Sequence, residues 1–564
     1  MIEHEVLVVG GGLAGLRAAV GLCREWDVAV LSKVHPVRSH SGAAQGGINA
    51  ALGNAPDGRD DSPEKHAFDT VKGSDYLADQ GAVAKMCALA PEVVCELEHW
   101  GAPFSRFPDG TIAQRPFGGA GFPRACYAAD KTGHVLLHTL YEQAVKRGIK
   151  VYDEFAVTGL AVRDDRCHGV IAYDLKRGRF ESFASKFCIF ATGGYGRMYR
   201  NSTNALINTG SGVGMALLAG VPAKDMEFVQ FHPTTLYGTN ILITEGARGE
   251  GGHLVNRLGD RFMARYAPKA MELAPRDIVA RSIQTEIDEG RGFEGGYVHL
   301  DLRHLGRDRI LERLPGIRTI CVEFAGIDPV EEPIPIQPGQ HYSMGGIDTD
   351  AAGRTRVDNF YAAGECACVS VHGANRLGGN SLADTVIFGR LVAEDINARK
   401  GHDDFQPKAS VLDEDLQQQT RRVDCILARR RGVPHSTLRD ELRQLCVEKM
   451  GVFRRKEDLS EAVARLGELR AQYRDVCCRT PPGPFLSEIL HVLELDGLLS
   501  LGEIIARGAL ARQESRGSHF RTDYPTRDDA RWLKHTLARL DGDQITLSYR
   551  EVDVSIYEPK ERTY

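Results

Sequence analysis

Paired cysteine motifs, long apolar runs and an excess of positive charge are all missing from this 564-residue chain. Its 13 cysteines are an odd number, and none stands in a C-x-x-C pair. That pattern predicts reduced thiols in a cytosolic compartment and no zinc or iron–sulfur site within this chain. A net charge of −6 offers no basic surface for a phosphate backbone, so nucleic acid is not an expected partner.

The apolar runs are far shorter than the roughly 20 residues that a bilayer-spanning helix requires. The first of them, Val6–Val9, is too short and comes too early for a secretory signal peptide. If the protein works at a membrane, another subunit must therefore hold it there. With 42% hydrophobic and 26% charged residues, the chain is expected to be globular and to contain several domains, without internal repeats.

A glycine-rich turn follows the first apolar strand. Val6–Val9 runs into a G-x-G-x-x-G motif at 10–15, and a helix-favouring segment follows. Such glycines let the backbone approach a pyrophosphate, which a helix N-terminus stabilises. The next strand, Val28–Leu31, lies at βαβ spacing, but Ser32-Lys33 stand where a ribose-binding acid is expected. Taken alone, the motif would also suit an ordinary glycine turn.

Two later segments favour FAD over NAD as the cofactor. Residues 187–194 form a buried strand that enters a glycine turn, and residues 357–365 form another that ends in an acid. Three such strand ends scattered along the chain match the FAD-binding variant of the Rossmann fold better than an NAD domain. Glu365 would then bind a ribitol or ribose hydroxyl, although it could also be a surface acid.

A helix is predicted to begin near Ser381. Ser381 and Asp384 have the spacing of a capping box, with Ser381 as N-cap and Asp384 at N3. The positive end of that helix could stabilise the charge that develops on the pyrimidine side of a reduced flavin. An ordinary capped helix would show the same residues.

Seven motifs occur in a fixed order: "RSHSGAAQGG", "FVQFHPTT", "TEGARGEGG", "PRDIVAR", "HYSMGGI", "AAGECA" and "HGANRLGGNSL". On these motifs the chain resembles the flavoprotein subunits of the succinate dehydrogenase and fumarate reductase family. The resemblance runs nearly end to end and includes "SRGSHFRTDYPTRDDARWLKHTL" and the terminal "PKERTY".

The expected fold is α/β. The resemblance implies a Rossmann-like FAD-binding domain at 1–236 and 342–403, interrupted by a mobile capping α+β domain at 237–341. A helical domain would follow at 404–540, because "FLSEILHVLELDGLLSLGEIIARGAL" and "ARWLKHTLARL" have apolar residues at helical spacing. The alternating tail "QITLSYREVDVSIY" predicts a small C-terminal sheet domain at 541–564.

The single imidazole of "RSHSGAA" is His40. The resemblance implies that this histidine is joined covalently to the 8α-methyl group of the flavin, and an imidazole nitrogen is a suitable nucleophile for that carbon. The bond should raise the reduction potential of the flavin. The cofactor contacts implied are Gly10, Gly12, Leu13, Ala14, Gly15, Ser32, Lys33, Ser39, His40, Ser41, Gly46, Gly47, Ala156, Thr192, Gly193, Ser211, Glu365, Asn380, Ser381 and Leu382.

Arg276 is the residue that local structure explains least. Pro275 is typical of the first position of a helix, and an arginine in that first turn opposes the helix dipole. A broken local rule of this kind is expected at a functional site. The resemblance makes Arg276 the proton donor in fumarate reduction and the acceptor in succinate oxidation, with Glu245 and Arg248 as a relay to solvent. That role requires a site that lowers the proton affinity of the guanidinium, which is normally always charged.

Four other residues are candidates for binding substrate carboxylates. His232 precedes a proline and should therefore be extended, and His341 follows a proline-rich segment that cannot be helical. Arg376 can hold a carboxylate with both arms of its guanidinium, and Thr244 adds a hydroxyl. The expected reaction is hydride transfer between substrate carbon and flavin N5, inside a site from which a closing cap excludes water.

The resemblance also implies partners and a location. Electrons would pass to an iron–sulfur subunit and on to a quinone-linked membrane anchor, with this chain peripheral on the cytoplasmic face. Two departures from the family pattern are Ser211, where an acid is usual, and a short 117–122 segment. The alternatives are an L-aspartate oxidase-like enzyme, which binds flavin without a covalent link, and a flavin-binding subunit without turnover.

Overall fold

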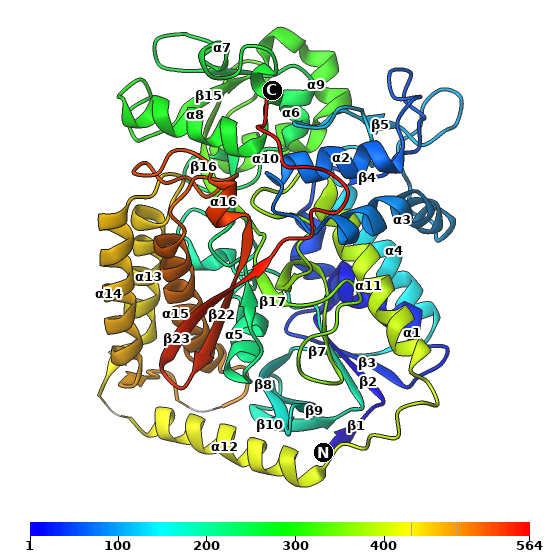
Figure 1. The fold of residues 1–564 in the computed structure, drawn as a ribbon, viewed down its shortest axis with the longest axis vertical. Helices are drawn as coiled ribbons and strands as arrows, with labels where there is room; N and C mark the ends of the chain where they lie inside the picture. The colour runs from blue at the N-terminus through cyan, green and yellow to red at the C-terminus, as the bar shows by residue number, and fades with distance from the viewer. Residues whose placement is uncertain (430, 482, 564) are drawn as a thin grey trace.

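The computed structural model describes residues 1–429, 431–481 and 483–563, and it contains a parallel sheet whose strands β2, β3 and β7 are labelled in the lower right of Figure 1. Its strand order is β18-β11-β2-β3-β7, and every neighbouring pair is parallel. The strands are β2 (Val6–Val9), β3 (Val28–Ser32), β7 (Lys150–Asp153), β11 (Phe187–Phe190) and β18 (Phe360–Ala362). The three predicted nucleotide-type strand ends therefore lie on neighbouring strands, with their carboxyl ends at one edge of the sheet.

Both faces of this sheet are covered. Val6 and Val8 pack into a core with the helices on one face, while Leu7 and Val9 pack into a second core on the other face. Successive side chains of a strand point to opposite faces, so burial on both sides explains the unbroken apolar sequence. The first core contains α1 (Leu13–Leu22), α3 (Gln80–His99), α4 (Thr132–Lys146) and α11 (Asn380–Ala398). The second face carries the sheet β1-β10-β9-β8: β1 (Ile2–Glu3), β8 (Phe155–Arg163), β9 (Arg166–Asp174) and β10 (Arg179–Ala184).

A separate core lies in the upper part of Figure 1. Its buried members are Leu236, which directly precedes the predicted capping segment, and residues from Ile243 to Ile336 within that segment. The sheet there has the order β13-β16-β15-β14, in which β13 and β16 pair antiparallel. Those two strands enter and leave the segment and so connect it to residues 1–236 and 342–403, the predicted FAD-binding part; the exact boundaries stay a prediction. The elements are β13 (Val229–Leu236), α6 (Glu245–Gly249), β14 (His253–Val255), α7 (Met263–Tyr266), α8 (Arg276–Asp288), β15 (Val298–Asp301), α9 (Arg307–Arg313), α10 (Pro315–Ala325) and β16 (Ile334–Ser343).

The C-terminal part begins with helices. The long apolar segment forms α15 (Ser487–Ala511), which packs with α13 and α14 as the predicted bundle (Figure 1). The other helices here are α12 (Ala409–Ala428), α13 (His435–Lys449) and α14 (Lys456–Tyr473).

The prediction of a further helix over 530–540 was wrong. Only Asp529–Trp532 is helical (α16), and β22 (Lys534–Asp541) follows, paired with β23 (Gln544–Glu551). This hairpin spans the boundary that we predicted at 540, and it continues a sheet with the order β19-β17-β12-β22-β23. Pairing of Ala538 with Ala223 shows why: a strand edge of the FAD-binding part overrides the local helical pattern. The partner strands are β12 (Ala223–Lys224), β17 (Gly346–Asp348) and β19 (Ala367–Cys368).

The cysteines form no disulfides: all 13 are free thiols. Among the described residues, no helix combines the length and the apolar character needed to cross a membrane. Further elements of the chain are the helices α2 (Pro63–Gly73) and α5 (Ser211–Leu218) and two short 3-10 turns at Pro36–Arg38 and His40–Ala43.

Candidate active site

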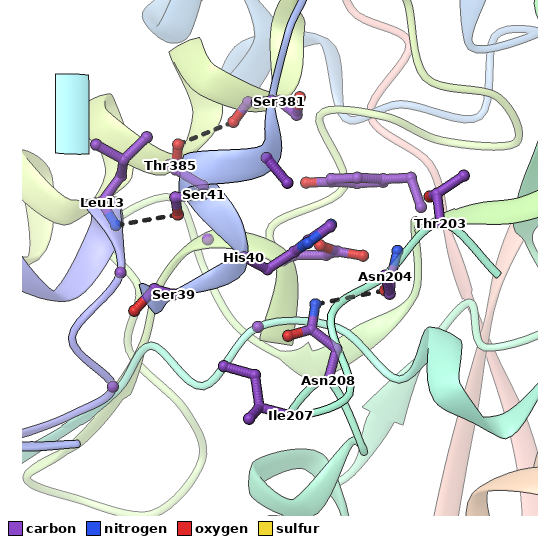
Figure 2. A pocket seen from close by; sticks show the side chains of 18 of the residues that line it. Leu13, Ser39, His40, Ser41, Thr203, Asn204, Ile207, Asn208, Ser381 and Thr385 are labelled. Atoms are coloured by element: carbon purple, nitrogen blue, oxygen red, sulfur yellow. Dashed lines mark hydrogen bonds between the residues drawn. The ribbon is translucent and has the colours of Figure 1, made fainter. Parts of the chain in front are cut away.

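A cavity of about 540 Å³ lies where the three strand ends meet the capping segment. That volume falls in the range of cofactor and small-molecule sites, roughly 300–1,000 Å³. Figure 2 shows the loop of Ser39, His40 and Ser41 facing the loop of Thr203 to Asn208 across this space. The predicted cofactor residues that line it are Gly10, Gly12, Leu13, Ala14, Ser32, Lys33, Ser39, His40, Ser41, Gly46, Gly47, Ala156, Thr192, Gly193, Ser211, Glu365, Ser381 and Leu382.

The predicted substrate and proton-transfer residues gather in the same cavity. Those that line it are His232, Thr244, Glu245, Arg276, His341 and Arg376. Three predicted site residues stand outside the lining: Gly15, Arg248 and Asn380. The side chain of Asn380 is instead committed to Asn49 (2.8 Å) and Thr70 (2.9 Å), so it supports the wall from behind.

The glycine turn after β2 is shaped for close backbone contact. A Cβ on Gly10 would lie 2.1 Å from the carbonyl oxygen of Ala191, and one on Gly15 would lie 2.0 Å from that of Gly10. Neither position therefore tolerates a side chain. Gly12 is the N-cap of α1, and both Gly12 and the first helical residue, Leu13, line the cavity; the N–H of Leu13 donates to the hydroxyl of Ser41 at 3.3 Å. A helix N-terminus of this kind suits the pyrophosphate of FAD.

His40 lies in the cavity wall with one ring nitrogen engaged. The backbone N–H of Ala205 donates to its Nδ1 at 3.2 Å, so Nε2 is the ring nitrogen that remains for a bond to the cofactor. Burial and the nearby Arg197 lower the pKa of His40 to about 4, so the imidazole is neutral at pH 7. With Nδ1 accepting from Ala205, the neutral ring carries its proton on Nε2, and this proton must leave when that nitrogen bonds to a carbon.

Glu365 follows β18 and lines the cavity, as the sequence predicts. Its Oε1 accepts a hydrogen bond from the backbone N–H of Ser343 at 3.0 Å. Burial raises the pKa of Glu365 to about 7 despite that bond. The carboxyl group can therefore either accept or donate a hydrogen bond near neutral pH, which suits contact with a hydroxyl group.

Arg276 is the first residue of α8. Pro275, which we predicted at the first helical position, is instead the N-cap, so the helix begins one residue later than predicted. Its Nε donates to Glu245 Oε2 at 2.7 Å, and Glu245 Oε1 accepts from the backbone N–H of Gly118 at 2.6 Å. Burial alone would raise the pKa of Glu245, but Arg276 and Arg248 outweigh it and lower that pKa. Glu245 is thus an anion held directly against the guanidinium.

Arg248 continues this chain of charges away from the cavity. Its Nη2 lies 3.9 Å from Glu245 Oε2, and its Nη1 donates to the carbonyl oxygen of Glu272. The side chain of Arg248 is 0% exposed, so the expected relay does not reach solvent at this residue. Contacts continue at Glu272, whose carboxylate pairs with the half-exposed Arg261 at 2.6 Å.

Gln230 is a site residue that our sequence analysis missed. It lies on β13, and its Oε1 accepts from Arg276 Nη1 at 3.3 Å and from Arg376 Nη2 at 3.1 Å. Its Nε2 donates to the carbonyl oxygen of Arg376 and to Asn375. A signal was available: Gln230 stands two residues before His232 on the same strand, so both point to one face.

Arg376 is fixed from several sides. Its Nη1 donates to the hydroxyl of Ser381 at 3.0 Å, and its guanidinium lies 4.4 Å from the ring centre of Tyr342. The capping box predicted for α11 is therefore wrong: Gly379 is the N-cap, no side chain caps the helix, and Ser381 serves Arg376 instead. Burial and the nearby Arg276 lower the pKa of Arg376 to about 9.

His232 and His341 face each other on the paired strands β13 and β16, with ring centres 4.9 Å apart. Burial and the surrounding arginines hold the pKa of both well below the usual range, so both rings are neutral. His232 Nδ1 lies 3.2 Å from both the backbone nitrogen and the carbonyl oxygen of Thr234; when the N–H of Thr234 donates to it, the ring proton is on Nε2. Among the described residues, this buried Nε2 has no hydrogen-bond partner.

Thr244 caps α6 with its hydroxyl, which accepts from the N–H of Gly246 at 3.2 Å. The hydroxyl hydrogen therefore remains available to a ligand. Together the predicted substrate and proton-transfer residues in the lining offer two guanidinium groups, two imidazoles and a hydroxyl, and the carboxylate among them, Glu245, is bound to Arg276. Donors of this kind in a buried cavity suit a small ligand with two carboxylates.

Comparison with known proteins adds independent findings. A family model for an FAD binding domain matches residues 5–382, and a model described as the C-terminal part of fumarate reductase flavoproteins matches residues 439–564. The succinate dehydrogenase flavoprotein subunit of Rickettsia conorii is 44% identical over 595 aligned residues, which cover 100% of this chain and 99% of the relative.

Two further relatives are similar over their whole length. The fumarate reductase flavoprotein subunit of Mycobacterium tuberculosis is 42% identical over 584 aligned residues, which cover 100% of this chain and 99% of the relative. Among solved structures, a mutant chain of the quinol fumarate reductase of Escherichia coli superposes with a TM-score of 0.96 at 39% identity. That match covers 100% of this chain and 99% of the other.

Proposed function

Because the chain belongs to the family of succinate dehydrogenase and fumarate reductase flavoprotein subunits, we propose that its cavity binds FAD and a four-carbon dicarboxylate. Members of this family are FAD-dependent oxidoreductases that interconvert succinate and fumarate, and this chain is one of them. The observation that supports the site assignment most directly is Gln230, which holds Arg276 and Arg376 to one cavity wall.

FAD, when bound, supplies a ring that accepts a hydride from succinate or returns one to fumarate. The glycine turn at 10–15 and the N-terminus of α1 would hold its pyrophosphate. Glu365 would bind one of its hydroxyl groups, and the first turn of α11 would face its polar edge. All of these residues were predicted from the sequence, and the predicted residues of the glycine turn that line the cavity are Gly10, Gly12, Leu13 and Ala14.

The substrate carboxylates would be bound by side chains from both parts of the molecule. One end of the substrate would meet two donors: the Nε2–H of His232 on β13 and the hydroxyl of Thr244 at the start of α6. The other end would meet Arg376, the cationic donor of the FAD-binding part. His341 keeps its imidazole against the hydroxyl of Thr203 at 2.8 Å, which fixes the ring orientation. Donors on opposite sides would hold a dicarboxylate at both ends.

Arg276 would move the proton. Its guanidinium lines the cavity beside Arg376, so it can address the carbon between the two bound carboxylates. Glu245, bound to its Nε, would take the proton next when succinate is oxidised and supply it when fumarate is reduced. Burial of this pair keeps water from competing with the transfer.

We expect Arg276→Lys to abolish succinate oxidation. A lysine ammonium cannot keep both the bond to Glu245 and the bond to Gln230 in their present geometry, so turnover with an artificial acceptor should fall by roughly 10²–10⁴-fold. The flavin content should stay unchanged. The matched control is Arg303→Lys, an exposed arginine of the capping segment that pairs with Asp301. Full turnover in Arg276→Lys would contradict the assignment.

His40 would form the covalent bond to the 8α-methyl group through Nε2, because Ala205 engages Nδ1. Nε2 would lose its proton and the methyl group one hydrogen, and the flavin ring would accept the two electrons released. The test is precipitation with acid: the pellet of the parent chain should keep its yellow colour and flavin fluorescence, and that of His40→Ala should lose both to the supernatant. Release of all flavin from the parent chain would rule out the bond. That result would leave only the non-covalent binding that an L-aspartate oxidase-like enzyme shows.

Electron transfer requires a partner. The relative from Escherichia coli is named a quinol fumarate reductase. We therefore propose that this chain exchanges electrons with an iron–sulfur subunit of a quinone-linked complex. It would lie peripherally on the cytoplasmic face of the cell membrane, held by an anchor subunit. Purification of the native complex and identification of its companion chains would test this arrangement.

A further inference from the structure

The cavity extends to the end of β3, where Ser32 and Lys33 line it. In nucleotide-binding βαβ units an acid about 20 residues after the glycine turn commonly binds a ribose hydroxyl. Neither Ser32 nor Lys33 is an acid, and Ser211 at the start of α5, which also lines the cavity, is uncharged. The usual source of a carboxylate is therefore missing from this part of the sequence.

A carboxylate reaches this place from a distant part of the chain. Glu494 on α15 lines the cavity, and Lys33 Nζ donates to its Oε1 at 2.5 Å. Lys33 also donates to the carbonyl oxygen of Ile207 at 3.0 Å and to the hydroxyl of Thr209 at 3.5 Å. These bonds tie Glu494 to the loop that leads into α5. Arg439 lies farther from the carboxylate, at 3.8 Å from Oε2.

The position of Glu494 is set by backbone packing between α5 and α15. A Cβ on Gly214 would lie 2.9 Å from the Cα of Gly497, so the two helices touch at paired glycines. Glu494 stands one turn before Gly497 on the same helix. Its side chain is 11% exposed and is therefore largely shielded from water. A charged group fixed in this way is suited to bind a polar ligand group rather than to solvate the surface.

We propose that Glu494 is the carboxylate that accepts a hydrogen bond from the adenosine ribose of FAD, with Lys33 as its fixed partner. The inference rests on the proposed function in one respect, since the cavity must bind FAD. An ionised carboxylate only accepts, and a ribose hydroxyl donates. The C-terminal helical part of the chain thus contributes a cofactor-binding residue where the nucleotide-binding segment has none.

The test uses the full chain with His40→Ala, so that flavin binding is reversible and can be titrated. In that background, Glu494→Gln should raise the dissociation constant for FAD about tenfold, because a charge-assisted hydrogen bond is lost. Adding Ser211→Asp should recover most of the affinity, because it places a carboxylate at another point of the same lining. Fluorescence quenching of added FAD measures both.

The matched control is Asp496→Asn, two residues farther along α15. Asp496 is also ion-paired, to Arg422 at 2.7 Å, but it does not line the cavity, so FAD affinity should not change. An unchanged dissociation constant in Glu494→Gln, or a loss no greater than in Asp496→Asn, would overturn the inference. Absence of FAD binding in the His40→Ala parent would instead count against the proposed function.

Discussion

At the scale of single residues, Gln230 connects the two arginines of the site. Its amide oxygen accepts from one guanidinium of the capping segment and one of the FAD-binding part, and its amide nitrogen is held by Asn375 and by the backbone of Arg376. The amide therefore sets the distance between the proton-transfer group and the carboxylate-binding group. A neutral acceptor does this without neutralising either cation.

We expect Gln230→Leu to lower kcat/KM for succinate by roughly 10–100-fold. Each hydrogen bond to a charged group contributes about 1.5–3 kcal/mol, and both arginines lose one. The affinity for malonate, a dicarboxylate that cannot be dehydrogenated, should fall as well, because Arg376 loses its support. The control is Gln340→Leu: this buried glutamine on β16 bonds Ser202 and touches neither arginine. Equal losses in the two variants would show that packing alone is involved.

Much of the site could be predicted at this scale, because the motifs carry chemistry that their local structure does not need. Arg276, in a first helical turn, and His232, before a proline, were predicted as site residues from such signals, and both line the cavity. Ser381 was misassigned, because its spacing to Asp384 fits a capping box while its hydroxyl is taken by Arg376. Short-range spacing does not reveal such tertiary competition. Gln230 was missed although it lies within the motif "FVQFHPTT", because its role depends on contacts with two arginines from distant parts of the chain.

At the scale of elements, β22 shows where sequence periodicity fails. Its residues have helical spacing, yet they form a strand that buries His535, Thr536 and Ala538 against the FAD-binding part. His535 Nδ1 lies 2.6 Å from Asp225 Oδ2, and its Nε2 lies 3.0 Å from Asp79 Oδ1. Three segments far apart in sequence thus meet at one imidazole, and the strand is selected by these partners rather than by propensity.

This cluster predicts a loss of stability at high pH. Burial alone would lower the pKa of His535, but Asp225 and Asp79 raise it to about 9, above the unfolded value of 6.5. The stabilisation is therefore complete below about pH 6.5 and lost as the pH rises through about 9. The difference corresponds to roughly 3 kcal/mol as an upper bound. Thermal unfolding of the parent chain and of His535→Gln between pH 6 and pH 10 measures it.

Other groups titrate over the same range, so the quantity to follow is the difference in Tm between the two chains at each pH. That difference should be largest near pH 6 and shrink toward pH 10. His402→Gln serves as the control, because this histidine lies outside the cluster. A constant difference between parent and His535→Gln would mean that the imidazole is not charged in the folded protein.

At the scale of the whole molecule, the last residues tie the two sides of the site together. In Figure 1 the C-terminal segment runs from the β22–β23 hairpin past α2 toward the capping helices. On the FAD-binding side, Gln80 Oε1 accepts from the backbone N–H of Tyr557 at 2.6 Å. On the capping side, Arg562 Nη2 lies 2.7 Å from Asp277 Oδ2 and 3.2 Å from Asp75 Oδ2. Asp277 directly follows Arg276, so the tail reaches the start of the helix that carries the proton-transfer group.

Asp277 depends on this contact. It is fully buried, and burial alone would raise its pKa, but Arg562 and Arg281 lower that pKa to about 2. Removal of one cationic partner leaves a buried charge that Arg281, at 3.2 Å, compensates only in part. The start of α8 should then lose its fixed position relative to the cavity.

We therefore expect Arg562→Ala to lower kcat/KM for succinate about tenfold while leaving the flavin content intact, because Arg562 contacts the start of α8 but does not line the cavity. Lys560→Ala, at an exposed cation of the same tail, is the matched control. A double-mutant cycle with Asp277→Asn should give a coupling free energy of about 1–3 kcal/mol in thermal unfolding. Additive losses in that cycle would show that Arg562 and Asp277 do not interact, and equal activity of the two alanine variants would show that the tail does not position α8.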